Sequence, residues 1–377
     1  MFPSAVKTLG QLFDRHDHQI RVVGGYVRDT LRGVKPKDLD LATSALPDQV
    51  MAMCDQRGIP YVTTGGGAKH GTVGVIIDHE MYEITTLRID RVTDGRHAEV
   101  EFTTDWQMDA MRRDFTINAM SMTLDGALFD YFDGRAHLED RRVVFVGDAG
   151  ARIREDYLRI LRYFRFCGRI GDKADSYDAV IRDTAPGLTQ ISGERIWLEM
   201  AKILSGDDLP HQLLGMWLND VFVHIGLPDI DVMSIHRAIE TRKATDNPIT
   251  VLSALTPCMR VAGAWNMSRQ ERQLIGWLQA KRQCRPTLSD LKACATCNGT
   301  RDYAPEWAAL FGPSADLDAI RAWQAPEFPV CGADLIDLGI SPGPNMGVML
   351  RRLQQVWQDS CYRLDKKQLL AALYVED

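Results

Sequence analysis

The chain has 377 residues, 45% of them hydrophobic and 25% charged, with a formal net charge of −7 at pH 7. This composition is typical of a folded, water-soluble protein and excludes an intrinsically disordered chain. The length allows two or three domains, and the negative net charge argues against a surface covered in positive potential for non-specific nucleic-acid binding.

The N-terminal stretch MFPSAVKTLGQLFDRHDH (1–18) has apolar residues at helical spacing, so we expect a helix there. It lacks the long apolar run and the small-residue cleavage site of a signal peptide. The eight cysteines are scattered along the chain, which favours reduced thiols in the cytoplasm. Cys294 and Cys297 form one CxxC with only Cys284 nearby, which is too few ligands for a zinc site.

The first 145 or so residues alternate short β-rich runs with helical patterns, which predicts an α/β or α+β domain. The predicted strands are IRVVGG (20–25), TVGVIID (72–78), MYEITTLR (81–88), GALFDYF (126–132) and VVFVG (143–147). Helices are predicted to begin at Tyr26, after Ser44 and after Thr104. From about Ala151 onward helical patterns follow one another, including RIREDYLRILRYFRF (152–166) and GERIWLEMAKILSG (193–206).

A local basic surface is predicted where the chain first becomes helical. Six arginines stand against two acidic residues between Arg152 and Arg169. Positive charge is therefore concentrated on one helical segment of an acidic protein.

The stretch GGYVRDTLRGVKPKDLDLAT (24–43) joins a predicted strand to a predicted helix. Gly24 and Gly25 let the backbone approach a ligand, and Arg28 in the first helical turn can add a charge-assisted contact to a phosphate. The alternative is a tight turn with a surface arginine, because the spacing matches neither common phosphate-binding motif.

Asp38 and Asp40 follow in the same stretch. In an extended segment alternate residues share a face, so the two carboxylates converge while Leu39 and Leu41 point the other way. A divalent cation such as Mg²⁺ would relieve their repulsion and bind a nucleoside triphosphate. The alternative is a solvated edge strand or turn.

In order along the chain, these residues resemble the class II tRNA CCA-adding enzymes and the related bacterial poly(A) polymerases. The resemblance runs through GGYVRDTLRGVKPKDLDLAT, KHGTVGVIID, EITTLR, MRRDFTINAM and EDYLRILRYFRF, and a weaker likeness returns in GADLIDLGISPGPNMGVMLRRL (332–353). It implies a mixed-sheet, DNA polymerase beta-like nucleotidyltransferase head domain followed by all-helical domains. The domains expected are a head (1–145), a base-selecting neck (146–210), and a tRNA-binding body and tail (211–377).

The resemblance implies nucleotidyl transfer, in which the 3'-hydroxyl of an RNA attacks the α-phosphate of CTP or ATP and pyrophosphate leaves. Asp38 and Asp40 would hold two Mg²⁺ ions, and Gly25 and Arg28 would hold the triphosphate. It also assigns Arg113 to the nucleotide, although an RR pair alone is usually a solvated helix face. Glu83 is a candidate third carboxylate or, equally, a paired structural acid.

The motif EDYLR (155–159) predicts how a base is selected. On a helix, Asp156 and Arg159 would lie side by side. One accepts and the other donates hydrogen bonds, which matches the amino group and ring nitrogen of cytosine or adenine and mismatches uracil and guanine. The alternative is an intrahelical salt bridge. Arg162 and Arg165 continue the threefold spacing, winding gradually round the helix, and the resemblance places both on the nucleotide.

Other readings stay open at this point. Asp94 and Arg96 match a loop that the family uses in switching from C to A addition, but His97 and Ala98 depart from its usual arginine and proline. Tyr157 replaces a usual proline. We expect tRNA, CTP and ATP as partners, Mg²⁺ as cofactor, and no membrane. The alternatives are a poly(A) polymerase, a partial CC- or A-adding enzyme, and a non-catalytic nucleotide- or RNA-binding protein.

Overall fold

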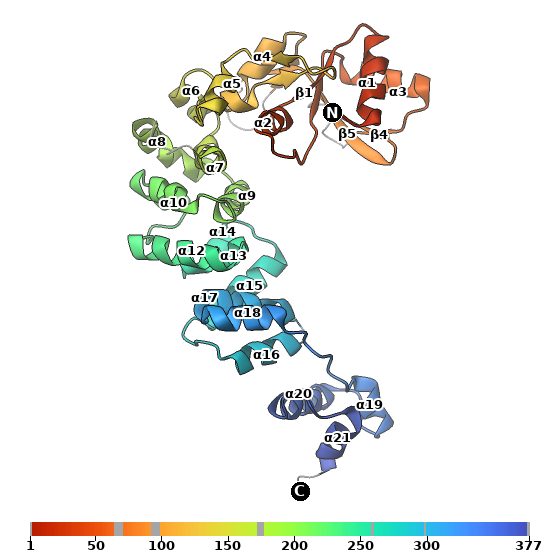
Figure 1. Ribbon diagram of the computed structural model, residues 1–377, viewed down its shortest axis with the longest axis vertical. Coiled ribbons are helices and arrows are strands. Elements are labelled where there is room, and N and C mark those ends of the chain that lie inside the picture. The colour runs from red at the N-terminus through yellow and green to blue at the C-terminus, as the bar shows by residue number, and fades with distance from the viewer. Residues whose placement is uncertain are drawn as a thin grey trace. The chain divides into compact units, whose positions relative to one another are not determined.

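The computed structural model describes residues 2–63, 71–91, 99–171, 177–257, 260–297 and 299–374. The chain forms two compact units, Met1–Asp231 and Val232–Asp377. Among the described residues, strands occur only in the first unit, and the second is entirely helical and loop (Figure 1). The α+β fold with a helical C-terminal part is therefore confirmed.

A mixed sheet forms the centre of the first unit, in the order β3-β4-β5-β2-β1-β8-β9. Its neighbouring strands are antiparallel except β2 and β5. The strands are β1 (Ile20–Val23), β2 (Leu41–Thr43), β3 (Tyr61–Val62), β4 (Thr72–Ile77), β5 (Glu80–Thr86), β8 (Ser121–Met122) and β9 (Leu128–Phe129). A separate hairpin pairs β6 (Arg88–Arg91) with β7 (Glu99–Phe102).

Helices flank this sheet and then continue the chain. Those before residue 145 are α1 (Ser4–Asp14), α2 (Gly25–Leu31), α3 (Pro47–Arg57), α4 (Trp106–Met111), the short η1 (Thr116–Asn118) and α5 (Gly134–Glu139). Those after it are α6 (Ala149–Glu155), α7 (Arg159–Ile170), α8 (Asp178–Thr184), η2 (Ala185–Gln190), α9 (Gly193–Leu204), α10 (Leu209–Leu218) and α11 (Val221–His224). The predicted N-terminal helix is confirmed, because the apolar face of α1 is buried.

Two strand predictions need correction. The stretch VVFVG (143–147) is not a strand, and its only β-type pairing is an isolated bridge between Phe115 and Phe145. Val143, Phe145 and Val146 are buried in the core, so the apolar run reflects packing without a neighbouring strand to complete a ladder. Of GALFDYF (126–132), only Leu128–Phe129 pairs in the sheet.

The stretch predicted as one helix over 152–166 is two helices with a break between them. Asp156 is extended, with φ −155° and ψ 102°, and its carboxylate accepts a hydrogen bond from the Leu158 N–H at 3.2 Å. A short acidic side chain that bonds to nearby backbone competes with helix continuation. Asp156 and Arg159 are therefore not neighbours on one helix.

An aromatic cluster anchors α7 to the core of the first unit. The Phe115 ring lies 4.8 Å from that of Phe145 and 5.4 Å from that of Phe166, and Tyr163 stacks on Phe145 at 5.8 Å, measured between centroids. All four side chains are buried. Burial of each contributes about 1.5–3 kcal/mol, so α7 is held against the segment that follows α4.

The second unit is built from helices. They are α12 (Val232–Ala244), α13 (Pro248–Leu255), α14 (Arg260–Ala264), α15 (Arg269–Ala280), α16 (Leu288–Thr296), η3 (Arg301–Tyr303), α17 (Ala304–Phe311), α18 (Ser314–Ala322), α19 (Gly332–Asp337), α20 (Pro344–Asp359), α21 (Lys366–Ala371) and η4 (Ala372–Tyr374). Cys294, at the end of α16, donates from its thiol to the Thr300 carbonyl at 3.3 Å, and burial raises the pKa of this thiol to about 11.

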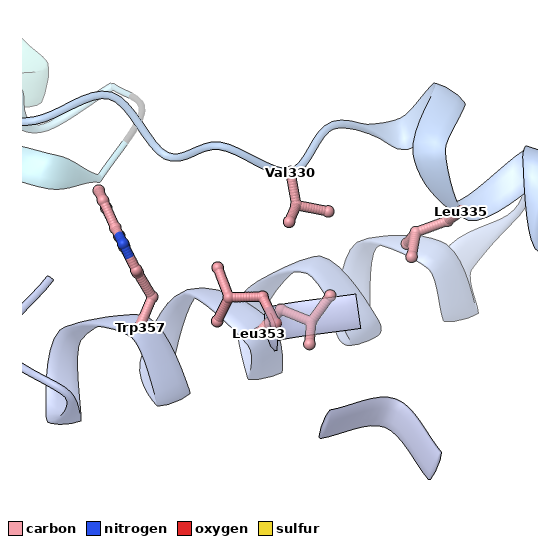
Figure 2. Packing of buried hydrophobic residues seen from close by; sticks show 5 residues of the cluster. Val330, Leu335, Leu353 and Trp357 are labelled. Carbon is pink, nitrogen blue, oxygen red and sulfur yellow. The ribbon is translucent and has the colours of Figure 1, made fainter. Parts of the chain in front are cut away.

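The C-terminal helices share a small apolar core. Leu353 and Trp357 of α20 lie on the side of the helix that faces the segment carrying Val330, and Leu335 of α19 belongs to the same cluster (Figure 2). Leu369 of α21 completes the buried cluster. This core holds the tail segment together, and no charged residue is buried in the part of the tail that the structure describes.

The predicted boundaries at 145/146 and 210/211 both fall inside the first unit, and the division into head, neck and body stays a prediction. Within the described ranges, no helix has the length and apolar character needed to cross a membrane.

Candidate functional site

One cavity in the first unit gathers most of the residues predicted from the sequence. Its volume is about 460 Å³, and we call it the arginine pocket. Seven arginines and three aspartates line it, so it carries a formal excess of four positive charges and suits a polyanion. Its lining residues are Gly24, Gly25, Arg28, Asp40, Arg112, Arg113, Asp114, Asn118, Asp156, Arg159, Arg162, Arg165, Phe166 and Arg169.

The glycine pair lies where β1 ends and α2 begins. Gly24 has φ +67°, a conformation that side chains disfavour. A Cβ on Gly24 would also lie 2.9 Å from Nη1 of Arg113, whereas one on Gly25 would meet only ordinary contacts. Gly25 was the residue predicted to bind, and it does line the pocket, but Gly24 is the position where the geometry requires glycine.

Arg28 is almost fully buried and already has partners. Its Nε and Nη2 each donate to Asp29 at 3.0 Å, and its Nη1 donates to Oδ1 of Asn118 at 2.6 Å. Asp29 also accepts from Arg169 of α7 at 2.6 Å. Burial lowers the pKa of Arg28, against the opposing effect of Asp29. Asp29 thus links α2 to the end of α7.

Asp38 and Asp40 lie in the segment without regular secondary structure that leads into β2, and both are exposed. Leu41 is buried as predicted, whereas Leu39 is only partly buried. Partial desolvation raises the pKa of the Asp40 carboxyl; Arg113 acts to lower it and the charge of Asp38 to raise it. Asp40 lines the arginine pocket, and Asp38 is two residues away on the same segment.

Arg112 and Arg113 follow α4 and share one buried carboxylate. Arg112 Nε donates to Asp109 at 2.9 Å, and Arg113 Nη2 donates to its other oxygen at 3.4 Å. Although burial alone would raise it, the pKa of Asp109 is lowered by Arg113 and Arg112. The pair is therefore not a freely solvated helix face.

Arg162 and Arg165 of α7 both line the pocket. Residues three apart are rotated relative to each other round the helix, but these side chains are long enough to reach the same cavity. Arg162 Nε donates to Asp114 at 2.7 Å, and Arg165 Nε lies 3.1 Å from Oε2 of Glu199 on α9. Burial lowers the pKa of Arg165 to about 10. Although burial opposes it, Arg162 holds the pKa of Asp114 below its usual range.

Asp156 and Arg159 line the same pocket but do not pair with each other. Arg195 of α9 donates to Oδ2 of Asp156 at 2.8 Å. Arg159 donates to Glu155 at 2.8 Å and to the Arg152 carbonyl at 2.6 Å. The alternative of an intrahelical salt bridge between Asp156 and Arg159 is therefore wrong.

Several residues that line or adjoin the pocket were missed from the sequence. Phe166 lies under three arginines, with the guanidinium of Arg165 4.4 Å from its centroid. Asn118 and Asp114 belong to the quoted segment MRRDFTINAM, where the RRD signal could have included them. Glu199 had no signal, because a lone glutamate on a helix is normally solvated.

The candidate third carboxylate, Glu83, is exposed on β5. It directly precedes Ile84, which pairs with Leu41 across the parallel strands, so Glu83 and Asp40 stand at the same level of the sheet. Within the described ranges, no group of three or more His, Cys, Asp or Glu side chains is placed to hold a metal. Asp94, Arg96, His97 and Ala98 lie outside the described residues.

Residues 20–144 match the family model described as "Poly A polymerase head domain". Over its whole length the chain is similar to proteins named "CCA tRNA nucleotidyltransferase 1, mitochondrial". The one from Mus musculus is 40% identical over 98% of this chain and 90% of its own length, and the one from Homo sapiens has the same values.

The fold is similar to that of a solved CCA-adding enzyme from Bacillus stearothermophilus, whose structure is described as in complex with CTP. The TM-score is 0.76 at 27% identity, with 99% of this chain and 98% of that chain covered. The similarity therefore spans both units of the chain.

Proposed function

Because this chain belongs to the family of CCA tRNA nucleotidyltransferases, we propose that the arginine pocket and the adjoining Asp38 form its catalytic site. The enzyme adds C, C and A to the 3' end of tRNA from CTP and ATP without a nucleic-acid template, and releases pyrophosphate. The observation that carries the assignment is one cavity lined by Gly25, Arg28, Asp40, Arg113, Asp156, Arg159, Arg162 and Arg165.

The family uses divalent metal ions, and we propose Mg²⁺ held by Asp38 and Asp40. The donors fit, because Asp38 and Asp40 both offer exposed carboxylate oxygens. The raised pKa of Asp40 also indicates that its surroundings do not fully stabilise the negative charge of this carboxylate. Bound ions would lower the pKa of the attacking hydroxyl and neutralise the leaving group. Glu83 remains a candidate third ligand.

The arginines would bind the triphosphate. Arg28, Arg113 and Arg162 each have a buried acidic partner, so their side chains are oriented before the ligand arrives. Pre-oriented charges need no reorganisation during the reaction, and they stabilise the negative charge that develops as pyrophosphate leaves. The guanidinium groups that line the pocket would donate charge-assisted hydrogen bonds to the phosphate oxygens.

Asp156 and Arg159 would read the base. Each is held by a separate partner, so the carboxylate can accept from the exocyclic amino group while the guanidinium donates to the ring nitrogen. Cytosine and adenine present this pair of groups, whereas uracil and guanine present the reverse. Selection then needs no template.

The second unit would hold the tRNA. Exposed basic side chains on and after α20, including Arg351, Arg363 and Lys367, suit a phosphate backbone. We retain the division into a head (1–145), a neck (146–210) and a body and tail (211–377).

For its location we propose the cytoplasm, because the described cysteines are all free; immunofluorescence against a mitochondrial marker tests this.

One assay tests the function and its alternatives. Purified protein is incubated with Mg²⁺, tRNA lacking its 3' end, and labelled CTP, ATP or both. We expect two C residues and one A. Runs of A without CTP would indicate a poly(A) polymerase, and arrest after CC, or addition of A only to tRNA ending in CC, would indicate a partial-addition enzyme. No extension at all would contradict the assignment.

A further inference from the structure

We infer that Arg195 is a specificity-determining positioning residue, which holds the Asp156 carboxylate in the orientation that selects cytosine or adenine. The inference rests on the proposed base-reading role of Asp156. Arg195 does not line the arginine pocket, so it would act through Asp156 and not by touching the nucleotide.

The two oxygens of Asp156 are held by different parts of the chain. Oδ1 accepts from the Leu158 N–H at 3.2 Å, within the break between α6 and α7. Oδ2 accepts from Nη2 of Arg195 at 2.8 Å, and Arg195 stands on α9, packed against α7. The second bond is charge-assisted and is the shorter of the two. Together they fix the plane of the carboxylate.

A fixed plane leaves each oxygen with capacity to accept one further hydrogen bond. One of these oxygens can take the amino group of cytosine or adenine while Arg159 donates to the neighbouring ring nitrogen. Arg159 has its own partners, Glu155 and the Arg152 carbonyl, so the two reading groups keep separate positions. Their spacing therefore depends on Arg195 at one side and on Glu155 at the other.

Without Arg195 the carboxylate keeps only the bond to Leu158 and can turn about its terminal torsion, which is broad. A turned carboxylate can accept from the ring N–H that uracil and guanine present. Asp156 would then no longer reject these bases. The loss should appear as relaxed choice of base, with little loss of stability, because Arg195 is 48% exposed and half-exposed ion pairs contribute little to folding.

The experiment compares Arg195→Ala with the control Arg154→Ala. Arg154 forms a similar ion pair with Asp183 from neighbouring α6, but it does not line the pocket or contact Asp156. The readout is kcat/KM for the first addition to tRNA lacking CCA, with CTP and with UTP. We expect Arg195→Ala to lower the CTP-to-UTP preference about 10-fold, the scale of one charge-assisted hydrogen bond. The control should keep it, and Arg195→Lys should restore part of it.

A double-mutant comparison separates this inference from the proposed function. If Arg195 acts through Asp156, Arg195→Ala should add no further loss of preference to Asp156→Ala. Additive losses, or an unchanged preference in Arg195→Ala, would overturn the positioning role. An unchanged preference in Asp156→Ala would instead refute the base-reading role itself. Thermal melts of all variants show whether any loss comes from unfolding.

Discussion

The two units differ in whether they bury charged side chains, although both bury hydroxyl side chains. Every fully buried charged residue among those described lies in the first unit; these are Arg21, Arg28, Asp29, Asp109, Asp114 and Glu199. The buried polar residues of the second unit are hydroxyl side chains, namely Ser234, Thr241, Thr245, Thr250, Ser253 and Thr256. A hydroxyl bonds easily to a helix carbonyl, as Ser253 does to Ile249 at 2.8 Å.

The buried charges indicate that the first unit meets a functional requirement as well as the requirement to fold. Burying a charge is costly unless it is paired, and apolar residues of similar volume are often at least as stable. In the first unit four of the described acidic residues are buried despite this cost, and each of them contacts arginines of the pocket: Asp29, Asp109, Asp114 and Glu199. The second unit, as in the tail core of Figure 2, is held by apolar packing.

The largest effect should come from Asp38→Ala and Asp40→Ala. Both carboxylates are exposed, so neither variant should lose thermal stability, while tRNA extension falls at least about 1,000-fold because metal binding supplies several kcal/mol to the transition state. Asp48→Ala, an exposed acid in the first turn of α3, is the matched control. Extension at near wild-type rate in either variant would contradict the metal assignment.

Glu199→Ala should destabilise the first unit. Its carboxylate lies 3.1 Å from Arg165 and 3.7 Å from Arg162, and its loss leaves cations uncompensated at a cost of about 3 kcal/mol. The melting temperature of that unit and the affinity for CTP should fall together. Glu194→Ala, exposed on the same helix, should change neither. Equal stability of the two variants would show that solvent in the pocket compensates the charges.

Leu353→Ala should separate stability from nucleotide binding. Leu353 is 1% exposed in the tail core, and its truncation should destabilise the second unit by about 2–4 kcal/mol. The affinity for CTP, measured by calorimetry well below the melting temperature, should stay unchanged. Val348→Ala, exposed on the same helix α20, controls for shortening a side chain. A weakened CTP affinity would mean that nucleotide binding depends on the tail.

The smallest effect should be a pH-dependent gain in folding stability in the variant Asp40→Asn. The pKa of Asp40 is raised in the folded state, so its ionised form destabilises the fold, and this cost grows as pH rises above its ordinary value of 3.8. In EDTA at pH 7 the variant should be more stable by on the order of 0.5 kcal/mol, an amount kept small by solvent screening. Melts in acid buffer should show no difference, and a gain that persists there would refute the electrostatic cause.

The two carboxylates and the arginine segment could be predicted because their signals are local. Alternation around Asp38 and Asp40, and the density of arginines between 152 and 169, depend only on spacing along the chain. The break at Asp156 was not predicted, because EDYLR fits a helical pattern. The sequence does not show whether the helix continues through Asp156 or whether its carboxylate accepts from the Leu158 N–H and ends the helix. The strand prediction at 143–147 failed because an apolar run does not reveal whether a neighbour pairs with it.

The sequence alone determined the fold class, the family and the residue types of the candidate site. Only the tertiary structure decided which acid meets which arginine: Asp29 with Arg169, Asp114 with Arg162, Glu199 with Arg165, and Arg195 with Asp156. These partners stand far apart in the sequence. They are brought together because α7 packs against the aromatic cluster of the first unit and against α9. An ion pair between distant residues produces no repeating pattern in the sequence, so the sequence does not predict which residues pair.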